Sequence, residues 1–233
     1  MMGKFSIFDQ VKKEGRSILT EFESKKVLKQ AGISVVETRL AKTQKEAVLL
    51  SRKMGFPVAL KIISPDVIHK SDSGGVKLSL NNASDVKKAY DEILKKVKKQ
   101  CPDAVIHGVG VQKMARPGTE VIVGSSKDPQ FGPVIMFGLG GIFVELLKDV
   151  SFRIIPLERK DALEMIKEIK GYPLLQGYRG KDPANISALV EIILKISKLI
   201  QENPTIKELE LNPIFVYRDK AVGVDARIIL EKD

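Results

Sequence analysis

From Thr20 to the end of the chain, helix-like and strand-like segments alternate, and no linker between them is longer than a loop. Helical segments show apolar residues at intervals of three or four, whereas strand segments alternate or form short apolar runs. In the first half these patterns predict helices at about 21–31 and 44–54, a lysine-rich helix after residue 82, and strands at 34–40, 57–63, 76–80 and 105–114.

The second half continues the alternation and predicts an α+β fold for the whole chain. Its expected strands are 119–124, 133–137, 152–156, 206–217 and 220–229, with helices near 159–170 and after Asp182-Pro183, where an aspartate cap precedes a first-turn proline. We therefore expect an N-terminal segment (1–20) and two α+β subdomains (21–112 and 113–233). A ligand site between two such layers is the natural arrangement.

Composition limits the classes of protein that this chain can represent. Hydrophobic residues make up 43% and charged residues 29%, as in ordinary globular proteins. The sequence contains no apolar run of 18 residues, so no membrane span is expected, and its start lacks the apolar stretch of a signal peptide. A single cysteine, Cys101, allows no internal disulfide and favours the cytoplasm. One cysteine and two histidines exclude a Cys/His metal cluster.

The net charge of +10 raises the question of nucleic-acid binding. Six of the lysines lie on one helical segment, opposite an apolar stripe that includes Val86, Ile93 and Val97, so they form its solvated face. Aromatic residues are only 6% of the chain and do not alternate with basic residues, as base-stacking surfaces require. We expect no nucleic-acid partner; anionic small molecules or an acidic partner chain suit this charge equally well.

The strand at 57–63 carries a lysine among apolar residues. Strand alternation places Ala59, Lys61 and Ile63 on the same face. An ammonium buried there is costly unless it meets an anion. The alternative is a strand at the edge of its sheet, where the lysine side chain reaches water.

A polar loop, residues 64–75, joins this strand to the next. It ends in two glycines, which permit close backbone approach, and successive loop amides can cradle a phosphate. Histidine can carry a proton or hold a phosphoryl group, and this setting favours such a role although a lone histidine usually has neither. The other histidine, His107, lies in a strand and is interpreted as structural. The candidate anion-contacting residues of the loop are His69, Lys70, Ser71, Gly74 and Gly75.

The last two strands form a hairpin if Arg218-Asp219 is its two-residue turn. That register places Asn212 opposite Asp225, with Glu210 two residues away on the same face. Three oxygen-bearing side chains on one sheet face suit a Mg²⁺ ion that also holds nucleotide phosphates.

Two features leave this metal assignment open. Arg-Asp is not a preferred two-residue turn, so a slip of register would separate the three groups. Acidic residues on an exposed sheet face are also common without a metal. Pro213 lies inside the strand and favours an edge position or a bulge.

Together these segments resemble the ATP-grasp architecture, and specifically the β chain of the ADP-forming acetyl-CoA synthetase family, from about Leu19 to Leu230. The most specific motifs are VALKIISPDVIHKSDSGGV at 58–76, FGLGGIFVE at 137–145, ELNP at 210–213 and Val224-Asp225. The succinyl-CoA synthetase β chain is similar at several of these positions but has no histidine that matches His69. The acetyl-type family is therefore favoured.

The resemblance implies an ATP-grasp fold of two α+β subdomains with the nucleotide site between them. It implies an acid–thiol ligase with the reaction acyl-CoA + ADP + phosphate ⇌ acid + CoA + ATP, through an acyl phosphate and a phosphohistidine. By analogy His69 would relay the phosphoryl group, Lys61 would bind phosphates, and Glu145 would support the glycine turn. The remaining assignments are Gln112, Lys113 and Met114 at adenine, Glu120 at the ribose, and Asn212 and Asp225, with Glu210, at Mg²⁺.

The resemblance also implies a partner. No dinucleotide-type glycine-rich fold flanks the ATP-grasp portion, so a separate α subunit would carry the CoA-binding domain and the first phosphohistidine, in an α2β2 assembly. Activity would require both chains. Two other functions stay open: another ATP-grasp carboxylate ligase, such as a succinyl-CoA synthetase-like enzyme, and a non-catalytic regulatory protein that binds nucleotides.

Overall fold

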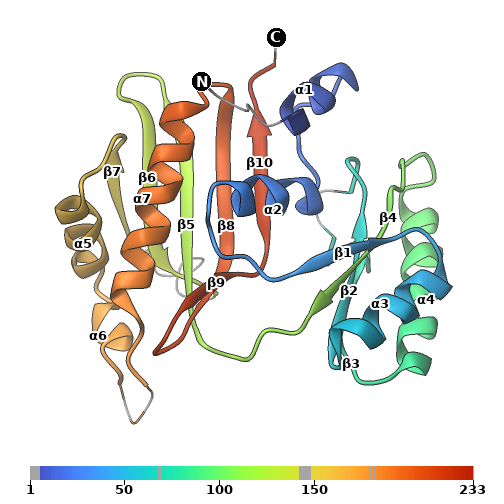
Figure 1. Ribbon diagram of the computed structural model, residues 1–233. Coiled ribbons are helices and arrows are strands. Elements are labelled where there is room, and N and C mark those ends of the chain that lie inside the picture. Colours follow the sequence, from blue (N-terminus) through green and yellow to red (C-terminus); the bar gives the residue numbers. More distant parts are fainter. Residues whose placement is uncertain (1–5, 68–69, 142–147, 179, 181, 233) are drawn as a thin grey trace. The chain divides into compact units, whose positions relative to one another are not determined.

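The computed structural model describes residues 6–67, 70–141, 148–178, 180 and 182–232, and its chain forms two compact units (Figure 1). Unit 1 comprises Met1–Leu19, Ser24–Val35 and Pro117–Asp233, and unit 2 comprises Thr20–Glu23 and Val36–Arg116. Both units combine an antiparallel sheet with helices, so the predicted α+β class is confirmed. No helix in the described part of the chain is both long and apolar enough to cross a membrane.

Unit 2 is built on a four-stranded sheet of order β1-β4-β2-β3. Helices α3 and α4 pack against each other and against this sheet (Figure 1). The interior strand β2 pairs with β3 on one side and with β4 on the other. It is buried along its whole length. The elements are β1 (Thr38–Ala41), α3 (Gln44–Met54), β2 (Val58–Ile63), β3 (Val76–Leu80), α4 (Ala83–Gln100) and β4 (Gly108–Lys113).

Local signals set the ends of the unit 2 helices. The Thr43 side chain accepts a hydrogen bond from the Glu46 N–H, and Gly55 ends α3 with a φ of 76° that suits glycine. In α4, the Asn82 side chain accepts from the Asp85 N–H at 3.0 Å. Its lysines face away from the buried stripe that includes Ile93, which confirms the predicted orientation.

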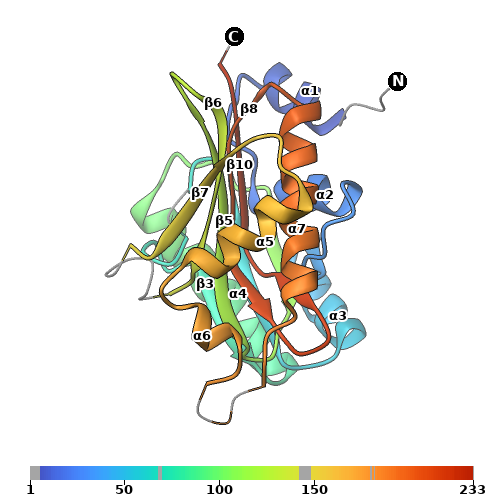
Figure 2. The ribbon, with the colours of Figure 1, turned by 90° about the vertical axis from the view of Figure 1, so that its left-hand side faces the viewer.

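Unit 1 contains a sheet of order β10-β8-β5-β6-β7, with β9 also paired to β8. Helices α5 and α7 lie on one side of this sheet (Figure 2). Along the interior strand β8, Leu209 and Leu211 are buried, whereas Glu208 and Glu210, which alternate with them, are partly exposed. The elements are α1 (Ser6–Lys13), α2 (Glu21–Gln30) from Ser24 on, β5 (Thr119–Asp128), β6 (Gly132–Leu139), β7 (Val150–Ile154), α5 (Arg159–Glu168), α6 (Tyr172–Leu175), α7 (Ile186–Glu202), β8 (Ile206–Val216), β9 (Ala221–Gly223) and β10 (Ala226–Leu230).

The division of the chain differs from a simple split near residue 112. Residues 24–35 pack with the C-terminal half, because Val27 and Leu28 of α2 are fully buried in the core of unit 1. Only the first residues of α2 belong to unit 2. A sequence pattern shows that this helix has an apolar face but not which core receives it.

The predicted start of the long helix at Asp182-Pro183 is wrong. Helix α7 begins at Ile186, and the Asn185 side chain accepts from the Ala188 N–H at 2.9 Å. Asparagine is as good an N-cap as aspartate, and the cap nearer the apolar stripe is the one used.

Candidate functional site

Lys61 lies in the middle of β2, an interior strand, so the edge-strand interpretation is wrong. The residue is only 6% exposed. Its Nζ donates to Glu21 Oε1 at 2.9 Å, which supplies the anion that a buried ammonium requires. The cation is thus held inside unit 2, on the strand that leads into the 64–75 loop.

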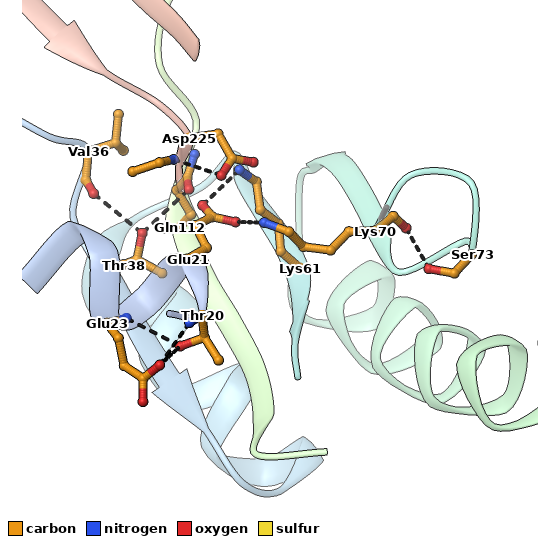
Figure 3. Close-up of polar contacts among 11 residues, drawn as sticks. Thr20, Glu21, Glu23, Val36, Thr38, Lys61, Lys70, Ser73, Gln112 and Asp225 are labelled. Atoms are coloured by element: carbon orange, nitrogen blue, oxygen red, sulfur yellow. Dashed lines mark hydrogen bonds and ion pairs between the residues drawn. The ribbon is translucent and has the colours of Figure 1, made fainter. Parts of the chain in front are cut away.

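The Glu21 carboxylate is shared between two lysines (Figure 3). Its side chain is 1% exposed, and its second oxygen, Oε2, lies 2.5 Å from Lys70 Nζ. Lys70 follows His69 in the chain, and its side chain is 17% exposed. One buried carboxylate therefore joins the strand before the loop to the residue just after the histidine.

Sequence reasoning missed Glu21. It lies in the first turn of α2, where acidic residues are common because they complement the helix dipole. The pairing with Lys61 spans 40 positions of the chain. No local pattern distinguishes a carboxylate that bridges two distant lysines from one that faces solvent.

The first turn of α2 is closed by a capping box (Figure 3). The Thr20 backbone N–H donates to Glu23 Oε2 at 2.7 Å, and the Glu23 N–H donates to Thr20 Oγ1 at 3.3 Å. Glu21 lies between these two residues. The box therefore fixes the backbone from which the Glu21 carboxylate extends.

The described end of the 64–75 loop is a compact turn. The Lys70 carbonyl accepts from the Gly75 N–H at 2.7 Å and from Ser73 Oγ at 3.0 Å. Gly74 has a φ of 65°, in the left-handed region that favours glycine. Ser71 is exposed beside this turn. The proposed phosphoryl carrier His69 lies outside the described residues.

Replacing Gly75 by alanine should destabilise the turn. The added Cβ would lie 2.5 Å from Ile62 Cγ2 and 3.0 Å from the Lys70 carbonyl oxygen. Ile62 is 1% exposed and cannot move freely, so we expect a loss of about 1–3 kcal/mol in the free energy of unfolding. Urea denaturation would measure it. The exposed Asp72→Ala, in the same turn, should stay within about 0.5 kcal/mol of the wild type; equal stability of both variants would contradict the expectation.

The three residues predicted at the adenine differ in their surroundings. Gln112 is 2% exposed, and its Oε1 accepts from Thr38 Oγ1 at 3.4 Å. The Lys113 ammonium donates to the carbonyls of Gly55 at 2.6 Å and Phe56 at 3.2 Å, at the end of α3. The Met114 N–H donates to a backbone carbonyl at 3.2 Å. The Lys113 ammonium is therefore already bound by carbonyl groups of unit 2. A ligand contact from Lys113 would have to come from its backbone.

In unit 1, Glu120 lies next to the glycine turn. The Gly140 N–H donates to the Glu120 carbonyl at 2.8 Å. A Cβ on Gly140 would lie 3.1 Å from the Glu120 Cβ, so the turn passes close over β5. The Glu120 side chain is exposed. Glu145, predicted to support this turn, lies outside the described residues.

The predicted register of the C-terminal hairpin is confirmed. The Asn212 N–H donates to the Asp225 carbonyl at 3.1 Å, and Arg227 pairs with Glu210 across the strands. The Asn212 amide nitrogen, Nδ2, donates to Glu210 Oε1 at 3.2 Å, so these two side chains share a face. Asp225 Oδ1 accepts from the Ala226 N–H at 2.8 Å. The three oxygen-bearing residues therefore lie together in unit 1.

Pro213 occupies an interior strand, which corrects the expectation of an edge position. The alternative of a bulge is confirmed: the register between β5 and β8 shifts between Val121 and Val123, opposite this part of β8. The Val224 N–H donates to the Pro213 carbonyl at 2.8 Å. The predicted strand 220–229 is accordingly interrupted, and Asp225 lies between β9 and β10.

Arg227 was not singled out from the sequence, yet its guanidinium lies 3.5 Å from Glu210 Oε2 and 3.7 Å from Glu208 Oε2. Glu210 thus interacts with a cation on one side and with Asn212 on the other. Among the described residues, no cluster of three or more His, Cys, Asp or Glu side chains could hold a metal. The oxygen donors of Asn212 and Asp225 are nevertheless the type that Mg²⁺ prefers.

The fold and these residues define a class of protein. The model of the ATP-grasp domain matches residues 10–230. The β subunit of ADP-forming acetate–CoA ligase I from Pyrococcus furiosus is 52% identical over 224 residues, which cover 96% of each chain.

Two solved structures of dinucleotide forming acetyl-coenzyme A synthetase 1 from Ca. Korarchaeum cryptofilum are also similar. The complex with coenzyme A, Ca-AMPCP and HgCl+ is 50% identical, with a TM-score of 0.95 over 97% of this chain and 99% of that one. The complex with coenzyme A and Mg-AMPPCP, whose phosphohistidine segment points towards the nucleotide binding site, is 46% identical with a TM-score of 0.86 over the same shares. The chain belongs to the ATP-grasp family, and within it to the β subunits of ADP-forming acetate–CoA ligases. The resemblance stated from the sequence is thereby confirmed.

Proposed function

We propose that this chain is the nucleotide-binding β subunit of an ADP-forming acyl-CoA ligase that is active only with an α subunit. The enzyme would interconvert acyl-CoA, ADP and phosphate with acid, CoA and ATP. The observation that carries the proposal is the Lys61–Glu21–Lys70 cluster, with its buried carboxylate, at the 64–75 loop of a chain that matches a ligase β subunit over 96% of its length. Two neighbouring ammonium groups, one buried and one partly exposed, suit nucleotide phosphates.

The reaction would form an acyl phosphate and then transfer its phosphoryl group three times. Phosphate displaces CoA from the acyl-CoA and forms an acyl phosphate; a histidine of the α subunit then takes the phosphoryl group and releases the acid. His69 would accept the phosphoryl group from that histidine and pass it to ADP, which gives ATP and restores both histidines. Lys61 and Lys70 would neutralise charge on the transferring and nucleotide phosphates. The amides of Ser71, Gly74 and Gly75 would add backbone donors.

Adenine and ribose would each have their own set of contacts. Gln112, Lys113 and Met114 would line the adenine, with Lys113 acting through its backbone because its ammonium already donates to Gly55 and Phe56. Glu120, exposed beside the glycine turn, would accept from the ribose hydroxyls.

Asn212 and Asp225 would hold Mg²⁺, which would neutralise charge on the nucleotide phosphates. Both offer hard oxygen donors, and the backbone bond of 3.1 Å keeps them together. Glu210 would orient the amide, because it accepts from Asn212 Nδ2 and so directs the amide oxygen away from itself. Arg227 would balance the charge of Glu210.

Reconstitution tests the proposed function. The chain is co-expressed with a candidate α subunit from its source, and ATP formation is measured with acetyl-CoA, ADP, phosphate and Mg²⁺. We expect ATP from the combined chains and none from either chain alone. Native mass measurement should give an α2β2 assembly. ADP binding with no ATP formation from any acyl-CoA, when an α subunit is bound, would instead favour a regulatory protein.

Replacing Asp225 by asparagine should weaken binding of Mg-nucleotide much more than it weakens folding. The amide oxygen can still accept from the Ala226 N–H, but the ligand charge is lost. We expect affinity for Mg-ATP to fall about 10-fold or more, with little change in Tm. Calorimetric titration with and without Mg²⁺ measures the effect. The turn residue Asp219, which is exposed, provides the control Asp219→Asn; a stable Asp225→Asn protein with wild-type affinity would exclude this metal site.

A further inference from the structure

We propose that Glu21 is a positioning residue, whose carboxylate holds the ammonium groups of Lys61 and Lys70 where the nucleotide phosphates bind. The inference rests on the proposed nucleotide function and deepens it. Glu21 would not touch the substrate; it would act on the reaction through the two lysines.

The geometry gives each carboxylate oxygen its own lysine. Oε1 lies 2.9 Å from Lys61 Nζ and Oε2 lies 2.5 Å from Lys70 Nζ. The lysines come from different elements, the middle of β2 and the turn after His69, and the same group ties them together. Their separation is therefore limited by the width of one carboxylate.

Two neighbouring ammonium groups repel each other, and the repulsion grows as water is excluded. A lysine side chain is long and flexible, so an anion fixed between the two limits the positions that both ammonium groups can take. The Glu21 side chain is 1% exposed, and its backbone is held by the Thr20–Glu23 box. A rigid anion of this kind reduces the reorganisation that phosphate binding would otherwise require.

A purely structural ion pair is the competing explanation. Buried pairs often contribute little net stability, and breaking one by removal of a partner is destabilising. Such a role predicts a lower Tm and the same relative change in affinity for every nucleotide. Positioning predicts a selective loss for ligands that carry β- and γ-phosphates, because only these would reach both lysines.

The experiment is calorimetric titration of the full chain with ATP and with AMP, each in the presence of Mg²⁺. For Glu21→Ala we expect ATP affinity to fall at least 10-fold and AMP affinity to change less than 2-fold. Glu21→Asp keeps the charge on a shorter side chain and should restore part of the ATP affinity. Should Glu21→Ala fail to fold, Glu21→Gln keeps the side-chain shape and should show the same selective loss.

The matched control is Glu23→Gln, which removes a carboxylate from the same helical turn. Glutamine can still close a capping box, and the Glu23 carboxylate accepts from the Thr20 N–H and hydroxyl in that box. ATP affinity should therefore stay within 2-fold of the wild type.

A second test asks whether Glu21 acts through the lysines. In a Lys61→Met, Lys70→Met background, the further change Glu21→Ala should alter ATP affinity less than 2-fold. Unchanged ATP affinity in Glu21→Ala, equal losses for ATP and AMP, or a full additional loss in the methionine background would overturn the positioning role. A wild-type chain that binds ATP but forms no ATP with its α subunit would contradict the proposed ligase function alone.

Discussion

Replacing His69 by alanine is expected to abolish ligase turnover by the assembled subunits, with a loss of at least about 10³-fold. The proposed reaction passes the phosphoryl group through this imidazole, and neither alanine nor water can take its place as carrier. ATP affinity should change less than about 3-fold, because the phosphate contacts proposed here come from Lys61, Lys70 and loop amides. ATP formation from acetyl-CoA, ADP and phosphate measures the first effect, and calorimetric titration measures the second.

The only other histidine, His107, provides a matched control. Its backbone N–H donates to the Ile63 carbonyl at 2.8 Å, and alanine keeps that bond. His107→Ala should therefore turn over like the wild type. Labelling with γ-³²P-ATP should mark the wild-type chain and His107→Ala but not His69→Ala. Turnover and labelling retained in His69→Ala would exclude the carrier role.

Replacing Lys61 by methionine is expected to lower ATP affinity about 10- to 100-fold, which corresponds to about 1.5–3 kcal/mol for the loss of a charged hydrogen bond. Methionine fills a similar volume in β2 without the ammonium. The Glu21 carboxylate keeps its contact with Lys70 at 2.5 Å, so the carboxylate is not left without a cation. Titration with ATP, together with a thermal melt, separates the loss of binding from a loss of folding.

Lys77→Met is the control for this change. Lys77 lies on the neighbouring strand β3 and pairs with Glu92 at 2.5 Å near the surface. Its replacement removes the same charge from the same sheet, and ATP affinity should remain within about 2-fold. If Lys61→Met folds and binds ATP as tightly as Lys77→Met, Lys61 does not bind the phosphates.

Much of the local structure could be predicted from short-range patterns. Helix α3 (Gln44–Met54) has the bounds expected from the sequence, because the Thr43 cap at its start and Gly55 at its end each act within one helical turn. The hairpin register was likewise predictable: a two-residue turn fixes every pair that follows, and Asn212 meets Asp225 as a result. The class of fold follows from the order of such elements.

The remaining features depend on contacts between distant parts of the chain. The Glu21–Lys61 bond and the packing of Val27 in unit 1 require the tertiary fold. The same is true of the Lys113 ammonium, whose partners at Gly55 and Phe56 lie more than 50 positions away. Pro213 could be linked to a bulge, but its interior strand could not be foreseen, since strand order is not encoded locally.

Strand β8 offers a way to redesign the chain. Leu209 and Leu211 are 1% and 0% exposed and hold the strand in register, because a slip of one residue would bring charged side chains into the core. Glu210, between them, meets Arg227 across the strands. The apolar face thus maintains the fold, whereas the polar face tolerates substitution, so charge-reversed or neutral pairs at these two positions can be introduced without altering the scaffold.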